Sequence, residues 1–125
     1  MPKGAVTTDK IAPPVGPFSP AVEWDGSLYL SGQVAQDPTS GKLIEGDVSD
    51  QTDQVLRNAL AVLEATGRDL SHVIRVGVYL TDMADFQAMN AVYARHFQSP
   101  YPARTTVAVS ALPLGARVEM DFLAG

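Results

Sequence analysis

The sequence predicts an α+β fold, in which one mixed β-sheet carries two helices packed on one of its faces. Three observations predict this fold. An Asp25-Gly26 dipeptide joins two strand-like segments, residues 47–66 carry apolar side chains at helical spacing, and β-branched residues recur in 105–109. Strands grouped around two helices are typical of a sheet that is covered on one face and open on the other.

The first predicted unit is a β-hairpin made of residues 21–24 and 27–33. Asp-Gly is favoured in a type I′ turn, because both central residues of that turn have positive φ. The run Asp37-Pro38-Thr39-Ser40-Gly41 predicts a second turn, and residues 42–45 are expected to form a short strand after it. Residues 1–20 contain five prolines and are expected to form an ordered or partly ordered lead-in.

The segment 47–66 is predicted to be a helix. Asp47 or Ser49 can cap its start, and Gly67 suits the left-handed position beyond its end. Arg57 and Glu64 fall towards the solvent side. The apolar stripe on the other side consists of Val55, Leu56, Ala59, Leu60, Val62 and Leu63.

A strand is predicted at 73–80, followed by a second helix from Thr81 or Asp82 to about Phe97, which Pro100 and Pro102 bring to an end. The core-facing side chains are expected to be Ile74, Val76, Val78 and Leu80 in the strand and Phe86, Met89, Tyr93 and Phe97 in the helix.

The last two predicted strands are 105–109 and 117–123. Alternation in the second gives a core face of Val118, Met120 and Phe122 and an open face of Arg117, Glu119, Asp121 and Leu123. Tyr79 and Val73 are expected on the same open face. Because that face mixes charged with apolar side chains, it indicates self-association.

Composition narrows the class of protein. A length of 125 residues and 46% hydrophobic residues fit a single domain, 1–125, with a real core. The net charge of −5 disfavours nucleic acid and anionic membranes as partners. The chain has no cysteine, no visible secretory signal and no apolar run long enough to span a membrane, so a cytoplasmic location is expected.

Common catalytic motifs are missing from the sequence. His72 and His96 stand apart from other ligand residues and are read as ordinary surface histidines, so no metal site is expected. The chain contains no glycine-rich phosphate loop and no G-x-S-x-G motif. An enzyme built on this chain is therefore expected to work without metal or cofactor.

Arg104 is the strongest candidate for binding an anion. It follows Pro100-Tyr101-Pro102-Ala103, whose prolines stiffen the chain, and a guanidinium held in place fits a carboxylate with its planar fork. The alternative is an exposed arginine at a strand end.

Glu119 is the second candidate, because a carboxylate on a sheet face can orient a water molecule. Its alternative is an ion pair with Arg117, Arg104 or Lys42.

Three further positions attract attention. Gly32, after Ser31 at the end of a strand, allows a ligand to approach the backbone closely, although it also suits a bulge. Phe18 lies on a loop stiffened by Pro17 and is either a binding residue or a core residue. Asn90 falls within an apolar helix stripe, where its amide needs partners from a ligand or from the local backbone.

These positions belong to segments that resemble the Rid (YjgF/RidA) family, over nearly the whole chain from Gly16 to the C-terminus. The most specific parts of this resemblance are Pro-Ala-Arg before Thr105 and Ser-Gly-Gln at the end of the hairpin. The matching segments are Gly16-Pro17-Phe18-Ser19, Leu30-Ser31-Gly32-Gln33, Gly46-Asp47, Gln51-Thr52, Val78-Tyr79-Leu80-Thr81-Asp82-Met83, Asn90-Ala91-Val92-Tyr93, Pro102-Ala103-Arg104-Thr105-Thr106-Val107, Leu112-Pro113 and Val118-Glu119.

The resemblance implies a chorismate-mutase-like α+β fold that assembles as a homotrimer, with a central barrel of sheets, helices outside and three sites between subunits. It implies hydrolysis of 2-imino and enamino acids, of the 2-iminobutanoate and 2-iminopropanoate type, to 2-keto acids and ammonia. In that reaction Arg104 would bind the carboxylate and Glu119 would position water. The expected substrate contacts are Phe18 from the adjacent subunit, Ser31, Gly32, Asn90, Thr105 and Thr106.

The chain departs from the family's pattern at Phe18, Pro20 and Leu114, where Tyr, Gln and Lys are common, and these changes bear on substrate preference. Other functions stay open. They are a non-catalytic trimer that binds small carboxylates, a dedicated catabolic deaminase for an aminomuconate-like compound, and an endoribonuclease or translation inhibitor, which the charge of −5 disfavours.

Overall fold

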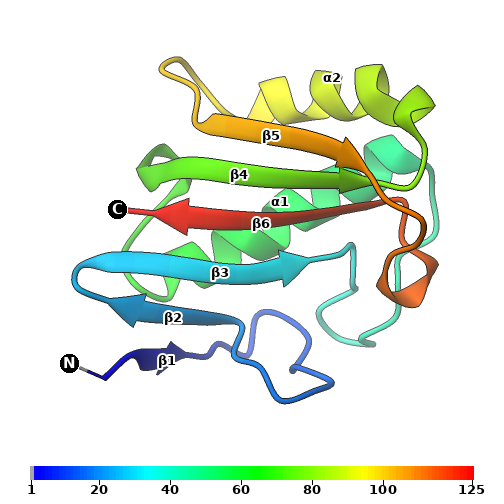
Figure 1. Cartoon of the computed structure of the whole chain (residues 1–125). Helices are drawn as coiled ribbons and strands as arrows, with labels where there is room; N and C mark the ends of the chain where they lie inside the picture. Colours follow the sequence, from blue (N-terminus) through cyan, green and yellow to red (C-terminus); the bar gives the residue numbers. More distant parts are fainter. Residues whose placement is uncertain (1) are drawn as a thin grey trace.

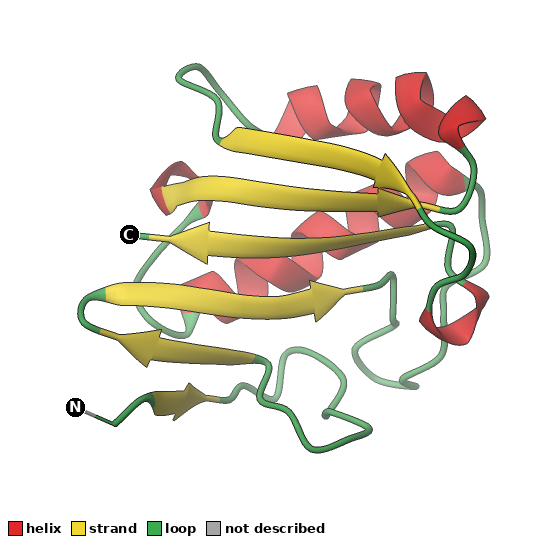
Figure 2. Cartoon of the chain, viewed as in Figure 1, coloured by secondary structure: helices red, strands yellow, loops and turns green. Residues whose placement is uncertain are grey.

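Six strands form one sheet in the order β1-β2-β3-β6-β4-β5 (Figure 1). The computed structural model describes residues 2–125. Figure 2 shows both α-helices on one side of the sheet, which confirms the predicted arrangement. The elements are β1 (Gly4–Val6), β2 (Ala21–Trp24), β3 (Ser27–Gln33), α1 (Val48–Glu64), η1 (Leu70–His72), β4 (Val73–Leu80), η2 (Met83–Asp85), α2 (Phe86–His96), β5 (Ala103–Ala108), η3 (Pro113–Gly115) and β6 (Val118–Ala124).

The predicted hairpin and the predicted turn after it are both present. Asp25 and Gly26 have φ angles of 50° and 79°, as a type I′ turn requires, and β2 pairs with β3 in antiparallel fashion. In the second turn the Asp37 carboxylate accepts hydrogen bonds from the backbone N–H groups of Thr39 and Ser40. These local side-chain contacts fix the turn, as the sequence predicts.

The register of the central strands decides which face each candidate residue occupies. β6 lies between β3 and β4 and is antiparallel to both, whereas β5 is parallel to β4 and reaches it through the crossover helix α2. Across the sheet, Val76 is level with Arg104 on β5 and with Phe122 on β6. Tyr79 is level with Glu119.

Helix α1 begins and ends where the sequence predicts. The Asp47 carboxylate accepts the backbone N–H of Asp50 at 3.0 Å, and the Asp50 carboxylate accepts the N–H of Asp47 at 3.1 Å. Gly67 follows the end of the helix with a φ of 75°. The buried stripe of α1 packs on β3 and β6, so this helix and the core face of the sheet form the main core.

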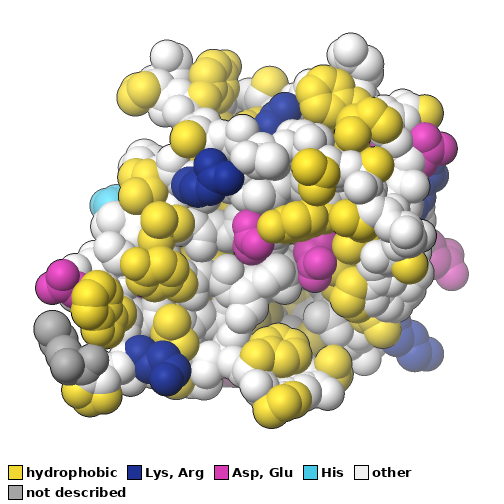
Figure 3. All heavy atoms as spheres, in the orientation of Figure 1, with side chains coloured by type: hydrophobic (Ala, Val, Ile, Leu, Met, Phe, Trp, Pro, Cys, Tyr) yellow, Lys and Arg dark blue, Asp and Glu magenta, His cyan; other side chains and the backbone are white. Residues whose placement is uncertain are grey.

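The two faces of the sheet differ sharply. Val118, Met120 and Phe122 are buried under the helices, as predicted. The other face is uncovered and carries acidic side chains near its middle among apolar ones (Figure 3). Tyr29 is 43% exposed there, and Glu119 and Asp121 are half-buried.

Two predictions about strands and one about the second helix are wrong, and one strand is not predicted. The register between β4 and β6 shifts between Val73 and Arg75, and this irregularity turns Val73 into the core and leaves Ile74 53% exposed. Residues 42–45 form only an isolated bridge, between Gln36 and Leu43. The unpredicted strand is β1, which lies in the ordered lead-in and pairs with β2. Helix α2 starts at Phe86, because Asp82 caps η2 instead.

Among residues 2–125, no helix combines the length and the apolar character that crossing a bilayer requires.

Candidate active site

Arg104 lies on the covered side of the sheet, because it is level with the buried Val76 on the neighbouring strand. Its guanidinium carbon is 4.7 Å from the ring centroid of Tyr93 and 5.7 Å from that of Phe86. Its Nη1 donates to the sulfur of Met89 at 4.0 Å. Helix α2 thus holds the side chain half-buried, through cation–π contacts.

The surroundings of Arg104 leave polar groups unsatisfied. Within residues 2–125, no carboxylate lies within 4.0 Å of its guanidinium. Asn90 Oδ1 and the Tyr93 hydroxyl are buried beside it without a hydrogen bond of ordinary geometry. Burial raises the pKa of Tyr93, and the charge of Arg104 only partly offsets this. Arg104, Asn90 and Tyr93, here called the Arg104 cluster, line a cavity of about 280 Å³.

Glu119 lies on the uncovered face, level with Tyr79 on β4. Burial raises the pKa of its carboxyl, and the negative charge of Asp121 raises it further. Asp121 is held in place, because it accepts hydrogen bonds from the Tyr79 hydroxyl at 2.9 Å and from the Gly77 N–H at 3.1 Å. Among the described residues no cation lies within 4.0 Å of Glu119, so the alternative of an ion pair is wrong. Arg117 instead pairs with Asp85 at 2.7 Å.

Gly32 and Phe18 accompany Glu119. A Cβ atom built on Gly32 would lie 2.7 Å from Glu119 Oε2, so the carboxylate rests directly on this backbone and any larger residue would displace it. Phe18 is 51% exposed and lines the same cavity of about 170 Å³ as Gly32 and Glu119. These three residues are called the Glu119 cluster.

The remaining candidates fall around the two clusters. The Ser31 hydroxyl donates to the carbonyl of Ser19 at 2.7 Å and so anchors the loop that carries Phe18; it can only accept a hydrogen bond from a ligand. Thr106 is level with buried Val78 and shares the covered side with Arg104. Thr105 points to the uncovered face, where its hydroxyl accepts from Arg75 at 2.9 Å.

The two clusters do not meet within one chain. Arg104 is level with Phe122, three positions along β6 from Glu119, and one strand, β4, separates β5 from β6. Strand spacings place the residues about 10 Å apart along the strands and about 10 Å apart across them. They also project from opposite faces of the sheet. A ligand of a few atoms cannot touch both in the same copy.

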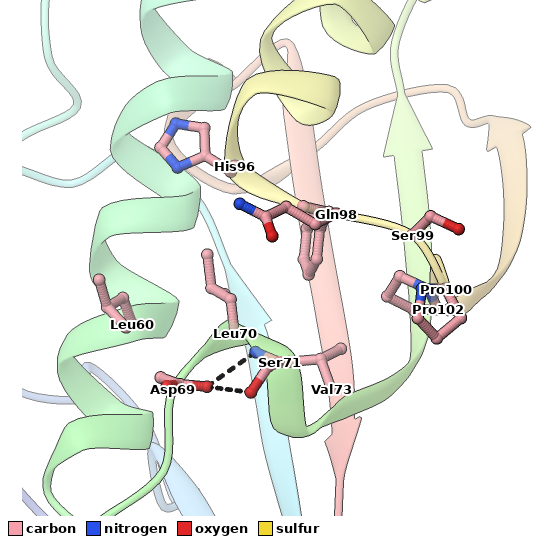
Figure 4. Close-up of a pocket in the computed structure, with 11 residues that line it drawn as sticks. Leu60, Asp69, Leu70, Ser71, Val73, His96, Gln98, Ser99, Pro100 and Pro102 are labelled. Carbon is pink, nitrogen blue, oxygen red and sulfur yellow. Dashed lines mark hydrogen bonds between the residues drawn. The ribbon is translucent and has the colours of Figure 1, made fainter.

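A larger cavity, of about 430 Å³, lies elsewhere, between α1, η1 and the segment after α2. Figure 4 shows Asp69, Ser71 and Gln98 at this cavity beside the apolar side chains of Leu60 and Leu70, with His96 above them. His96 Nε2 is hydrogen-bonded to the Asp53 carboxylate at 2.8 Å, and His72 Nδ1 is hydrogen-bonded to the Asp69 carboxylate at 3.1 Å. This cavity contains none of the predicted site residues.

Comparison with known proteins decides the family. The sequence model of a family described as "Endoribonuclease L-PSP" matches residues 8–125. A solved structure of YyfA from Yersinia pestis, described as a member of the conserved Rid protein family, superposes with a TM-score of 0.96 at 38% identity and covers 99% of both chains. The chain belongs to the Rid family.

Other Rid proteins are similar over almost their whole length. A mouse protein named 2-iminobutanoate/2-iminopropanoate deaminase is 42% identical over 119 residues, which are 95% of this chain and 88% of that protein. The crystal structure of E. coli TdcF with bound serine superposes with a TM-score of 0.90 at 31% identity and covers 96% of each chain. The predicted Rid fold is confirmed.

The sequence of this Rid protein predicts Tyr93 only as a core residue, although its hydroxyl lies in the Arg104 cluster. A signal for it exists, because Asn90 and Tyr93 are three residues apart and therefore share a helix face. The hydrogen bond from the Tyr79 hydroxyl to Asp121, beside Glu119, is also not predicted from the sequence, because it depends on the register of β4 and β6.

Proposed function

We propose that this Rid protein hydrolyses small 2-imino acids to 2-keto acids and ammonia, at sites that combine the Arg104 cluster of one copy with the Glu119 cluster of another. The observation that carries the proposal is Arg104, a half-buried cation with no carboxylate partner among residues 2–125 and with two unsatisfied polar atoms beside it. A small carboxylate would pair with Arg104 and accept a hydrogen bond from the Tyr93 hydroxyl, whereas Asn90 Oδ1 needs a donor group on the same ligand. The name of the mouse relative and the serine bound to TdcF support this choice of ligand.

Assembly is part of the proposal, because the clusters lie on opposite faces of one sheet. A homotrimer whose three uncovered faces form a central barrel would bring the β5 edge of one copy to the Glu119 cluster of the next. The half-exposed Tyr29 and Val107 on that face support self-association. Phe18 would then be the contribution of the adjacent subunit.

The chemistry requires orientation and one proton acceptor. Arg104 would hold the substrate carboxylate with two parallel N–H···O bonds, so that the imine carbon faces Glu119. Glu119 accepts a proton as water adds to that carbon, and returns it to the nitrogen of the tetrahedral carbinolamine. Glu119 then takes the hydroxyl proton of the carbinolamine and passes it to the nitrogen, so that the C–N bond breaks, ammonia leaves and the C=O bond of the 2-keto acid forms. Asn90, Ser31 and the backbone near Gly32, Thr105 and Thr106 would complete the contacts.

A rate assay tests the activity. With 2-iminopropanoate generated in place, the protein should accelerate ammonia release, and Arg104→Ala should remove the acceleration. Arg57→Ala is the matched control, because Arg57 is exposed on α1 and pairs only with Asp53 in the described structure. Equal rates for the unaltered protein and Arg104→Ala would sink the proposal.

Subunit mixing tests the shared site. Arg104→Ala and Glu119→Gln should each be inactive alone, but when the two are unfolded and refolded together, about a quarter of the sites in random trimers receive both native side chains. Recovery of roughly that share of activity supports a site between copies. No recovery in verified mixed trimers would mean that both residues act within one chain.

A second candidate is a binding trimer without turnover. Phe18 has no hydroxyl, and the Ser31 hydroxyl proton is engaged by Ser19, so neither side chain offers a proton to the ligand. Calorimetry with 2-ketobutyrate, combined with the rate assay, separates the two. Binding without imine hydrolysis would favour the second candidate.

The description of the matching family also raises ribonuclease activity. The net charge of −5 and the carboxylates on the uncovered face make RNA a poor partner, so we expect equal and negligible RNA cleavage by the unaltered protein and by Arg104→Ala.

The absence of cysteine suits a reducing compartment, and we therefore propose that the protein acts in the cytoplasm, which fluorescence microscopy of a tagged chain tests.

A further inference from the structure

The cavity beside Glu119 is unlike the cavity beside Arg104. Its walls are mostly apolar, and Glu119 is the one charged residue among the described residues that line it. The other polar side chains at its wall are Gln33 and Gln36, and the Gln36 amide already donates to the carbonyl of Gly41 at 3.0 Å. A ligand group seated there meets hydrocarbon on most sides and a carboxylate at one end.

The walls are also preformed. Four prolines line the cavity, Pro13, Pro14, Pro20 and Pro113, and each has a fixed φ. Phe18 sits on a tight turn closed by its own N–H and the carbonyl of Gly16 at 2.8 Å, and a Cβ on Gly16 would touch its ring at 3.4 Å. A cavity with stiff apolar walls binds apolar groups at a lower ordering cost than a mobile one.

Leu114 strengthens this interpretation. Its φ is 61°, a left-handed conformation that costs a branched residue energy, and its side chain is 55% exposed at the cavity wall. Asn or Gly would suit this backbone better. A strained position that holds an exposed leucine at a cavity points to contact with a ligand.

We propose that this cavity receives the side chain of the substrate and makes the protein prefer 2-imino acids with large, uncharged, apolar side chains. The inference rests on the proposed function, since it assigns the part of the substrate that lies beyond the imine carbon. The volume of about 170 Å³ is close to the cavity of about 150 Å³ that accommodates benzene in another protein. An isobutyl or benzyl group fits this space, whereas Glu119 repels an acidic side chain.

The test compares imines generated from alanine, leucine, phenylalanine and glutamate. Each buried methylene is worth about a fourfold gain, so we expect kcat/KM for the leucine and phenylalanine imines to exceed that for the alanine imine by about tenfold or more. The glutamate imine should be the poorest substrate. Equal values for all four, or a preference for the alanine or glutamate imine, would overturn the inference.

Leu114→Asn tests the wall itself, because asparagine tolerates the left-handed backbone but removes the apolar surface. The ratio of kcat/KM for the leucine imine to that for the alanine imine should fall at least threefold. Met83→Asn is the control, since Met83 is 45% exposed on η2 and does not line the cavity. An unchanged ratio in Leu114→Asn would count against the inference.

Binding separates this inference from the proposed function. If no imine is hydrolysed, the proposed function fails, but the affinities for 4-methyl-2-oxopentanoate, pyruvate and 2-oxoglutarate still report on the cavity. Tighter binding of 4-methyl-2-oxopentanoate than of the other two supports the cavity assignment without turnover. Equal affinities, or no binding of any of the three, would overturn it.

Discussion

Arg104 and Glu119 are both half-buried charged residues without an ion-pair partner among residues 2–125, but the structure surrounds them in opposite ways. Two aromatic rings face the guanidinium of Arg104 and stabilise its charge. The carboxylate of Glu119 has another carboxylate for a neighbour, which together with burial raises its pKa.

The difference separates two tasks. A cation stabilised by π faces stays charged and suits a permanent role in binding an anion. A carboxyl with a raised pKa gains and loses its proton nearer neutral pH and suits proton transfer. The comparison therefore predicts that changes in the Arg104 cluster alter binding and changes in the Glu119 cluster alter turnover.

The largest effect on kcat should follow from Glu119→Gln. Glutamine has nearly the same size but cannot accept the proton of water, so kcat should fall by about 10²- to 10⁴-fold. The affinity for a 2-keto acid product should be kept or should rise, because the amide removes a negative charge from the surroundings of the bound anion. Steady-state kinetics and calorimetry on the same preparation measure both quantities.

Arg104→Ala is the opposite case, because we expect this variant to lose its affinity for the 2-keto acid. If Glu119→Gln abolished binding while Arg104→Ala retained it, the two roles would have to be exchanged.

Arg104→Lys should have the next largest effect. Lysine keeps the positive charge but loses the planar fork, so kcat/KM should fall by about 10- to 100-fold, mainly through a higher KM. Full activity in Arg104→Lys would show that charge alone is needed. Circular dichroism should show the same fold in both proteins, since Arg104 lies on the edge strand β5.

Local parts of the fold are predictable from the sequence, because their signals lie within a few residues. The Asp25-Gly26 turn and the Asp47 cap are examples. The irregularity near Val73 is not predictable in this way, since it depends on how β4 pairs with β6. Likewise, one face of β5 carries Arg104 and Thr106, and the other face carries Thr105 and Val107. Neither pair is clearly apolar. Alternation alone therefore cannot show that Arg104 and Glu119 lie on opposite faces.

Asp121→Asn should produce a moderate effect that is visible in the pH dependence. Glu119 must be ionised to accept a proton, so kcat/KM declines as the pH falls through its pKa. Removing the charge of Asp121 lowers the pKa of Glu119 and moves this decline to lower pH, while the effect of burial remains. Glu64→Gln on α1 makes the same change in net charge far from the site and should leave the profile in place. A shift to higher pH in Asp121→Asn would contradict the assignment of the decline to Glu119.

The smallest effect should come from Tyr93→Phe, and it distinguishes a ligand contact from a structural one. The Tyr93 hydroxyl is buried without a hydrogen bond of ordinary geometry. Its removal should therefore leave the free energy of unfolding unchanged or raise it by up to about 1 kcal/mol, and the melting temperature should follow in the same direction. If the hydroxyl binds the ligand held by Arg104, KM should rise by about two- to tenfold in the same variant. Tyr101→Phe, at a side chain that is 60% exposed, calibrates the melting temperature. A lower melting temperature with an unchanged KM would mean that the assembled protein satisfies this hydroxyl itself, and Tyr93 would then leave the Arg104 cluster.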